Sequence, residues 1–324
     1  MNQPHVDPRR LRGNLLLLLA AALWGFAFVA QKHGAEHMGP FSFSSVRFAM
    51  GGLLLVGVIV VLDRVRHRPA AKRRAATRAV LVPGGICGLF LAAAVVAQQA
   101  ALSYTSVGNA AFITGLYMVL VPVLGAFRGT RISLFTVLGV VLCVPGLYLI
   151  AVTEGFTIGR GDALLLAAAL LFAIQILIVD HYAPRLSALR FSSAQFLSCA
   201  VCAGVAGLFL DAHPYGGMRE SVIPLLYGGF ISVGIAYTLQ VFGQRDALAA
   251  HAALIMSMET VFGALGGALL LHENMGLRGY SGAALMILGI VASQLDSLRK
   301  PAPADPADPA DPAASAAPAA PTGP

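Results

Sequence analysis

The sequence predicts an all-α polytopic membrane protein, with ten transmembrane helices arranged as two inverted five-helix repeats. Three observations support this fold class: a very apolar composition, apolar runs of membrane length, and a resemblance between the two halves of the chain. The mean hydropathy is +0.77, and 11% of the residues are charged. Soluble domains carry about 25% charged residues, so most of this chain must face lipid or other apolar segments.

The apolar runs have the length that a membrane-spanning helix requires. A helix needs about 20 apolar residues to cross the hydrocarbon layer, and its backbone groups must be satisfied within the segment. Ten segments meet this requirement: 14–33, 41–62, 79–99, 105–127, 132–151, 161–180, 190–210, 221–243, 247–271 and 276–296.

The two halves of the chain share sequence features at similar spacings, 147 residues for one motif and 143 for another. The tetrapeptide at 20–23, Ala-Ala-Ala-Leu, recurs at 167–170, and the glycine pair at 139 and 146 recurs at 282 and 289. Because each copy has an odd number of spans, the second copy must enter the membrane from the opposite side. We therefore divide the chain into an N-terminal segment (1–13), a first repeat (14–151), a second repeat (161–296) and a disordered tail rich in Pro, Ala and Asp (301–324).

Basic residues define the expected orientation. With the N-terminus inside, 17 of the 22 Lys and Arg residues face the cytoplasm, and the other five are Lys32, Arg47, Arg160, Arg219 and Arg278. This bias predicts a multi-pass protein of the cell (inner) membrane with both termini cytoplasmic. We expect the basic stretch 63–78 to form the longest connection and to contact anionic lipid headgroups. It lacks interleaved aromatic residues, which argues against nucleic-acid binding.

No sequence motif indicates enzymatic, metal or redox chemistry. The four cysteines all lie inside apolar spans, and the histidines are scattered. There is no motif for a hydrolase, a metalloprotease or a phosphate-binding loop. We therefore expect no enzymatic activity and no cofactor, and no domain that could hydrolyse ATP.

Glu259 is the most informative polar residue. It lies about twelve residues from either end of the ninth span, or roughly 18 Å from each interface at 1.5 Å per residue. A carboxylate at this depth is unfavourable unless it faces a cavity or a partner. It is either a site for a substrate amine or a proton, or a structural partner for an arginine or for the backbone of the other repeat.

Arg47 is the second candidate, about six residues into the second span. Its counterpart in the second repeat is Gln195. Arg47 could bind a substrate carboxylate through paired hydrogen bonds, or it could form an ion pair with Glu259. The remaining candidates for substrate contact are Trp24, Asn109, Thr114 and Tyr117, although polar residues in membranes also join neighbouring helices. Gln98, Gln175 and Gln240 raise the same ambiguity.

Several short motifs resemble those of a known family. They are Leu-Trp-Gly-Phe-Ala-Phe-Val-Ala at 23–30, His-Met-Gly-Pro at 37–40, Val-Arg-Phe at 46–48, Tyr-Thr-Ser-Val-Gly-Asn-Ala at 104–110 and Leu-His-Glu at 271–273. In this order they resemble the EamA-type repeats of the drug/metabolite transporter superfamily, over residues 14 to 296. The resemblance implies inverted five-helix repeats around a central cavity and ATP-independent export or exchange of amino acids, other metabolites or toxic compounds. One departure is that Arg-Gly-Thr-Arg at 128–131 replaces the family's Leu-Gly-Glu-Arg turn.

These observations predict a secondary transporter that exports small metabolites, amino acids or drugs by alternating access. Its expected partners are a small-molecule substrate and the lipid bilayer, with protons and a second copy of the chain as further candidates. Two alternatives stay open: a flippase for lipids or polyprenyl carriers, and a membrane subunit that transports nothing.

Overall fold

The computed structural model describes residues 8–105, 107–151, 159–270 and 276–295, and every regular element in these ranges is a helix. The predicted tail (301–324), most of the N-terminal segment and the Leu-His-Glu motif at 271–273 lie outside them. The helices are α1 (Pro8–His37), α2 (Pro40–Val65), α3 (Ala70–Ala101), α4 (Val107–Gly115), α5 (Tyr117–Phe127), α6 (Leu134–Ala151), α7 (Arg160–Tyr182), α8 (Ala188–Leu210), α9 (Val222–Leu226), the π-helix η1 (Tyr227–Tyr237), α10 (Thr238–Gly243), α11 (Ala249–Met256), α12 (Glu259–Leu270) and α13 (Gly276–Gln294).

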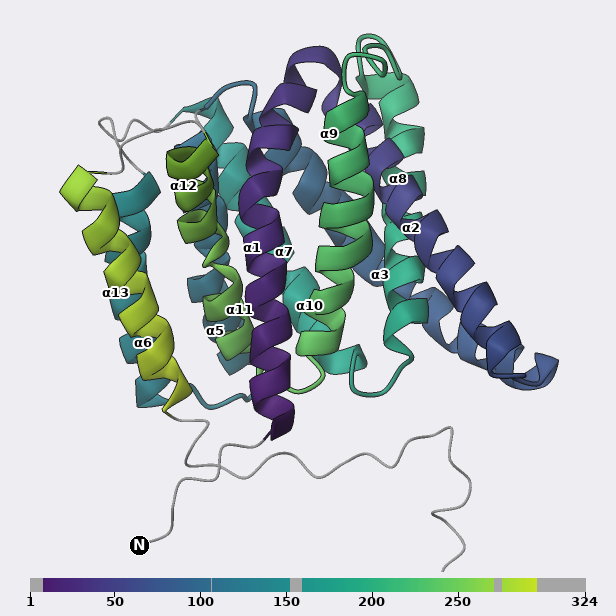
Figure 1. Cartoon of the computed structure of the whole chain (residues 1–324), viewed down its shortest axis with the longest axis horizontal. Helices are drawn as coiled ribbons and strands as arrows, with labels where there is room; N and C mark the ends of the chain where they lie inside the picture. The colour runs from purple at the N-terminus through teal and green to yellow at the C-terminus, as the bar shows by residue number, and fades with distance from the viewer. Residues whose placement is uncertain (1–7, 106, 152–158, 271–275, 296–324) are drawn as a thin grey trace, which may run out of the picture.

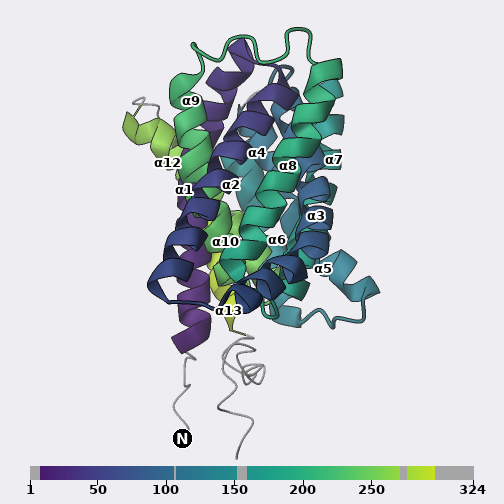
Figure 2. The same cartoon turned by 90° about the vertical axis from the view of Figure 1, so that its right-hand side faces the viewer.

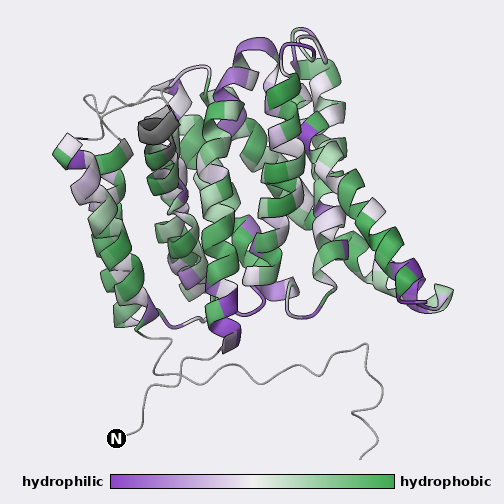
Figure 3. Cartoon of the chain, viewed as in Figure 1, coloured by the Kyte–Doolittle hydropathy of each residue, from purple (hydrophilic) through white to green (hydrophobic). Residues whose placement is uncertain are grey.

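These helices form ten membrane spans. Within the described ranges, eight helical stretches are long and apolar enough to cross a membrane, and two shorter apolar stretches, Leu134–Ile150 and Ala249–Leu265, complete the set. Three spans contain more than one element: α4 with α5, α9 with η1 and α10, and α11 with α12. The spans run side by side, and apolar residues cover most of their length (Figures 1 and 3). The predicted ten-helix, all-α membrane fold is confirmed.

The basic stretch 63–78 does not form the long connection that we expected. α2 continues to Val65 and α3 begins at Ala70, so only residues 66–69 connect them. The reason is that Ala, Lys and Arg are strong helix formers, and residues 70–79 consist almost entirely of them. The two helices therefore extend beyond the apolar body and diverge from it, as Figure 1 shows at the lower right.

The helices α2 and α8 pack as an antiparallel pair (Figure 1) whose contacts follow a two-fold pattern. Ser42, near the start of α2, donates through Oγ to Asp211 Oδ2 at the end of α8, at 2.6 Å. Arg190, near the start of α8, donates through Nη2 to Asp63 Oδ2 near the end of α2, at 2.5 Å. Residues 190 and 211 lie 148 positions after residues 42 and 63, so each bond is the image of the other after the repeats are exchanged. This reciprocity is what oppositely threaded copies require.

Further contacts between the repeats follow the same exchange. Ser45 Oγ donates to the carbonyl of Ala200 at 2.9 Å, and Ser193 Oγ donates to the carbonyl of Gly52 at 3.3 Å. The last pair of spans, α6 and α13, also packs reciprocally. An added Cβ on the glycine at 146 would lie 2.7 Å from the carbonyl oxygen of the glycine at 282, and the reverse distance is 2.6 Å. Only glycine permits this backbone approach.

The fourth and ninth spans are interrupted at equivalent places. α4 ends at Gly115 and α5 begins at Tyr117, whereas α11 ends at Met256 and α12 begins at Glu259. Around both interruptions the backbone forms tight hydrogen bonds between residues three apart, such as Val119 N to Leu116 O at 2.9 Å. The two breaks place Tyr117 and Glu259 at the first positions of the following helices.

Candidate functional site

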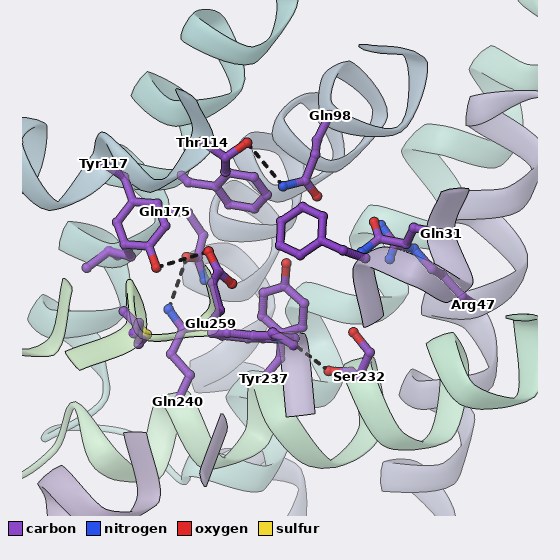
Figure 4. Close-up of a pocket in the computed structure, with 15 residues that line it drawn as sticks. Gln31, Arg47, Gln98, Thr114, Tyr117, Gln175, Ser232, Tyr237, Gln240 and Glu259 are labelled. Atoms are coloured by element: carbon purple, nitrogen blue, oxygen red, sulfur yellow. Dashed lines mark hydrogen bonds between the residues drawn. The ribbon is translucent and has the colours of Figure 1, made fainter. Parts of the chain in front are cut away.

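A small polar cavity lies between the two repeats and contains the ends of both interrupted spans. Its volume is about 40 Å³, enough for a few water molecules, since one water needs at least about 10–15 Å³ on this measure. The cavity is drawn in Figure 4. The residues that line it are Trp24, Phe28, Gln31, Arg47, Gln98, Thr114, Tyr117, Phe172, Gln175, Ile176, Ser232, Tyr237, Gln240, Met256 and Glu259.

Glu259 lies at the centre of this site and is 6% exposed. The hydroxyl of Tyr117 donates a hydrogen bond to Glu259 Oε1 at 3.3 Å (Figure 4). Glu259 is the first residue of α12, where the positive end of the helix dipole favours a negative charge. The break in the ninth span thus gives a carboxylate a favourable position inside the membrane, and the break in the fourth span gives it a hydrogen-bond donor.

Arg47 is buried, with 2% of its surface exposed, and turns into the bundle. Within the described residues it forms no ion pair, and its Nε has no hydrogen-bond partner. Its guanidinium carbon lies 5.2 Å from the centre of the Phe48 ring and 5.6 Å from that of Phe43. The ion pair between Arg47 and Glu259 that we considered is therefore absent, and the Arg47 guanidinium keeps donors that a bound anion could use.

Aromatic residues form one wall of the cavity. Trp24 Nε1 donates to the carbonyl of Ser232 at 3.3 Å, and the Trp24 ring packs edge-on against Tyr237 at 4.6 Å between centroids. Ser232 and Tyr237 both belong to η1, and π-helical stretches are frequent at functional sites. Next to Trp24, α1 packs directly against α12: an added Cβ on Gly25 would lie 2.6 Å from the Gly263 backbone nitrogen. This close helix contact fixes the position of Trp24.

Amide side chains form a second wall and lead away from the cavity. Gln98 Nε2 donates to Thr114 Oγ1 at 3.3 Å. Gln240 Nε2 donates to Gln175 Oε1, and Gln175 Nε2 donates to Gln195 Oε1, both at 3.3 Å. Each amide fixes the orientation of the next one, so the polar lining is held in a defined arrangement.

The structure brings together five of the seven residues that we selected from the sequence: Glu259, Arg47, Trp24, Thr114 and Tyr117. Asn109 is half-buried, and neither it nor Gln195 lines the cavity. Gln195 is completely buried, one hydrogen bond behind the lining, and also accepts from Cys87 Sγ at 3.1 Å.

Several lining residues escaped the sequence analysis, among them Phe172, Ser232 and Tyr237. Tyr237 and Gln240 are three positions apart within one apolar span, so they share one helix face. That spacing was the available signal. Phe172 carried no signal, because it is one apolar residue among many.

Comparisons with known proteins agree with this architecture. The model of the EamA-like transporter family matches residues 11–152 and 159–293. A protein of Archaeoglobus fulgidus named "Uncharacterized transporter" is 28% identical and aligns with 89% of this chain and 87% of its own length. The Bacillus subtilis "Uncharacterized transporter YoaV" is 20% identical over 85% of this chain and 94% of its own.

The fold also matches a solved structure whose description reads "Crystal structure of protein". The two superpose with a TM-score of 0.71 at 19% sequence identity, over 89% of this chain and 98% of the other. At this identity the likeness concerns the fold alone. The family match covers both five-helix halves around the cavity, and the chain therefore belongs to the EamA-like transporter family and is a multi-pass membrane protein.

Proposed function

We propose that this protein is a secondary transporter that exports small organic solutes by alternating access, with the central cavity as its solute-binding site. The observation that carries this proposal is the cavity itself, where an unpaired Arg47 and the carboxylate of Glu259 face the same space between the repeats. Charged groups inside a membrane are unfavourable and mark solute or ion pathways. A subunit that transports nothing would instead be expected to have a dry, tightly packed centre.

The lining defines the solute that fits best. Arg47 can pair with a carboxylate or another planar anion, and Glu259 can pair with an amine. The rings of Trp24 and Tyr237 offer an apolar surface between these charges. The best match is a small solute that carries both a negative and a positive group, such as an amino acid or a related metabolite.

The cavity must enlarge for such a solute to enter. A volume of about 40 Å³ is far below the 300 Å³ or more of typical ligand sites. The helices can bend at the interruptions between α4 and α5 and between α11 and α12, because the regular backbone hydrogen-bond ladder is already broken there. We infer that the structure represents an occluded arrangement and that opening occurs by relative movement of the two repeats.

The charge distribution supports the orientation that we propose. The excess of Lys and Arg at the end where α1 begins favours a cytoplasmic location for both termini under the positive-inside rule. Glu259 is the residue that we propose to exchange a proton for solute, since it is the acidic group of the lining. Export driven by the proton gradient needs no ATP.

The test is solute flux in proteoliposomes that contain the purified protein. A panel of radiolabelled amino acids, nucleosides and organic cations should reveal at least one solute whose flux depends on the protein. Glu259→Gln should reduce this flux to the level of empty liposomes. Glu36→Gln, which removes an exposed carboxylate at the end of α1, is the matched control and should retain full flux.

Three outcomes would contradict the proposal. Unchanged flux in Glu259→Gln would remove the assigned role of this carboxylate. Flux that does not respond to a pH jump across the membrane would remove proton coupling. Movement of lipid-linked probes in place of soluble solutes would identify a flippase.

A further inference from the structure

We propose that a groove between α2, α3 and α8, at the arginine-rich end of the bundle, binds one anionic phospholipid. This site is separate from the central cavity and shares no lining residue with it. The proposal does not depend on the solute that the protein moves. Figure 2 shows these three helices on the side that faces the viewer.

The groove is large and mostly apolar. Its volume is about 630 Å³, which exceeds that of the central cavity by more than an order of magnitude. The apolar part of the lining consists of Val56, Ile59, Val60, Ala70, Val80, Leu81, Ala194 and Leu197. Side chains of this kind fit an acyl chain, because lipid tails make only dispersion and hydrophobic contacts.

Three arginines from the first turns of α3 line the polar end of the groove. They are Arg73, Arg74 and Arg78, and within the described part of the chain none of them forms an ion pair. Arg74, Arg78 and Leu81 follow each other at intervals of four and three residues, so they share one helix face. This face therefore passes from guanidinium groups to an apolar side chain, as a phospholipid passes from phosphate to acyl chain.

The other charged groups of the groove neutralise each other. Asp63 accepts from Arg190 at 2.5 Å, and Arg190 also donates to Thr77 Oγ1 at 2.7 Å. The carboxylate of Asp63 therefore does not oppose an anion, and the remaining charge is that of the three arginines. Clusters of basic residues next to a membrane attract anionic headgroups by about 1 kcal/mol per residue.

A phospholipid would contact both the arginines and the apolar residues of the groove, whereas a small anion would contact only the arginines. Free phosphate would contact the arginines and leave the apolar walls unused. The groove also lies where the apolar body of α2 and α3 ends and their basic extensions begin, which is the depth of a headgroup in the adjacent leaflet.

Native mass spectrometry of the purified protein tests this proposal. The protein is titrated with phosphatidylglycerol and with phosphatidylcholine that carry the same acyl chains. We expect the first phosphatidylglycerol to bind at least tenfold more tightly than the first phosphatidylcholine. The triple variant Arg73→Gln, Arg74→Gln, Arg78→Gln should bind both lipids equally.

The matched control is Arg64→Gln, Arg66→Gln, Arg68→Gln, which removes the same charge from the same region but outside the groove. It should keep the preference, and an equal loss in both triple variants would show nonspecific electrostatic attraction and overturn the proposal. Ile59→Trp, which fills the apolar part, should weaken phosphatidylglycerol binding although all arginines remain. Complete displacement by equimolar inorganic phosphate would also overturn the proposal. Thermal unfolding in detergent confirms that each variant is folded before its binding is compared.

Discussion

The helices α2 and α8 occupy the same place in the two repeats, yet they differ at the residue that faces the central cavity. Both contain Phe-Ser-Ser followed by a phenylalanine three residues later, at 43–48 and at 191–196, and both end in a buried aspartate. Between these shared residues, Arg47 in the first repeat corresponds to Gln195 in the second. Arg47 lines the cavity, whereas Gln195 is buried behind it.

This comparison distinguishes the residues that hold the two repeats together from those that line the cavity. The shared residues make the reciprocal contacts that hold the repeats together, including the edge-on contact of the Phe48 and Phe196 rings, whose centroids lie 6.0 Å apart. The residues that differ supply the charges of the cavity. Similarly, the two interrupted spans have equivalent breaks, but one presents the hydroxyl of Tyr117 and the other the carboxylate of Glu259. Two-fold packing builds the framework, and departures from it supply the charged groups of the cavity.

The largest expected effect concerns the two equivalent aspartates. Asp63→Asn leaves the buried Arg190 without its carboxylate, and breaking a buried ion pair in this way destabilises a protein by about 3–5 kcal/mol. Asp211→Asn should lower the free energy of unfolding by only about 1 kcal/mol, since the amide oxygen can still accept from Ser42. Unfolding in mixed detergent micelles measures both values.

The double variant Asp63→Asn, Arg190→Gln is the control, and it should recover most of the loss because no charge remains unpaired. Equal destabilisation by Asp63→Asn and Asp211→Asn would show that the two ends of the helix pair are energetically equivalent. The distinction between them would then be wrong.

The second prediction concerns the position where the repeats differ, Arg47 in the first and Gln195 in the second. Arg47→Gln should lower solute flux about 10- to 100-fold, because hydrogen bonds from a charged donor contribute about 1.5–3 kcal/mol. Gln195→Met, at the equivalent position, should lower flux by less than Arg47→Gln does, up to about tenfold, since Gln195 acts on the cavity only through its hydrogen bond from Gln175. Proteoliposome flux, corrected for the amount of folded protein, distinguishes the two. Equal losses would mean that Arg47 acts through packing.

The third prediction concerns a contact that both repeats share. Gly146→Ala and Gly282→Ala each place a Cβ within about 3 Å of the carbonyl of the opposite glycine, and overpacking of this kind destabilises by about 1–3 kcal/mol. Because the two substitutions disturb one reciprocal contact, their effects on the free energy of unfolding should be equal, and the double variant should lose less than the sum. Additive losses would contradict a single shared contact.

The smallest effect is expected for Tyr117→Phe. This change removes the hydrogen bond to Glu259 Oε1 and preserves the ring. Because the bond is long, at 3.3 Å, the loss should be about two- to tenfold in flux, which is less than the about 1.5–3 kcal/mol of a short bond to a charged group. Tyr280→Phe, at an exposed position on α13, is the control. A loss as large as that of Glu259→Gln would indicate that Tyr117 itself contacts the solute.

The fold was predictable to a large extent because it depends on local properties. Apolar runs report their own length, and the spacing of alanines and glycines revealed the duplication before any contact was known. The extension of α3 was missed, because the charges of residues 70–78 suggested a loop although their helix propensity is high. Glu259 and Arg47, which both line the cavity, were recognisable as candidates, since isolated charges stand out in an apolar sequence.

The sequence by itself determined that the chain is a ten-helix membrane protein with duplicated halves, and that a few charged residues lie inside the membrane. Hydropathy, length and repeated motifs are local quantities, and they suffice for these conclusions. Only the tertiary structure decided that Tyr117 bonds to Glu259, that Arg47 has no carboxylate partner among the described residues, and that Gln195 lies behind the lining. These relations depend on how helices distant in the chain pack, and the angle at which two helices pack is set by side chains distant in the chain.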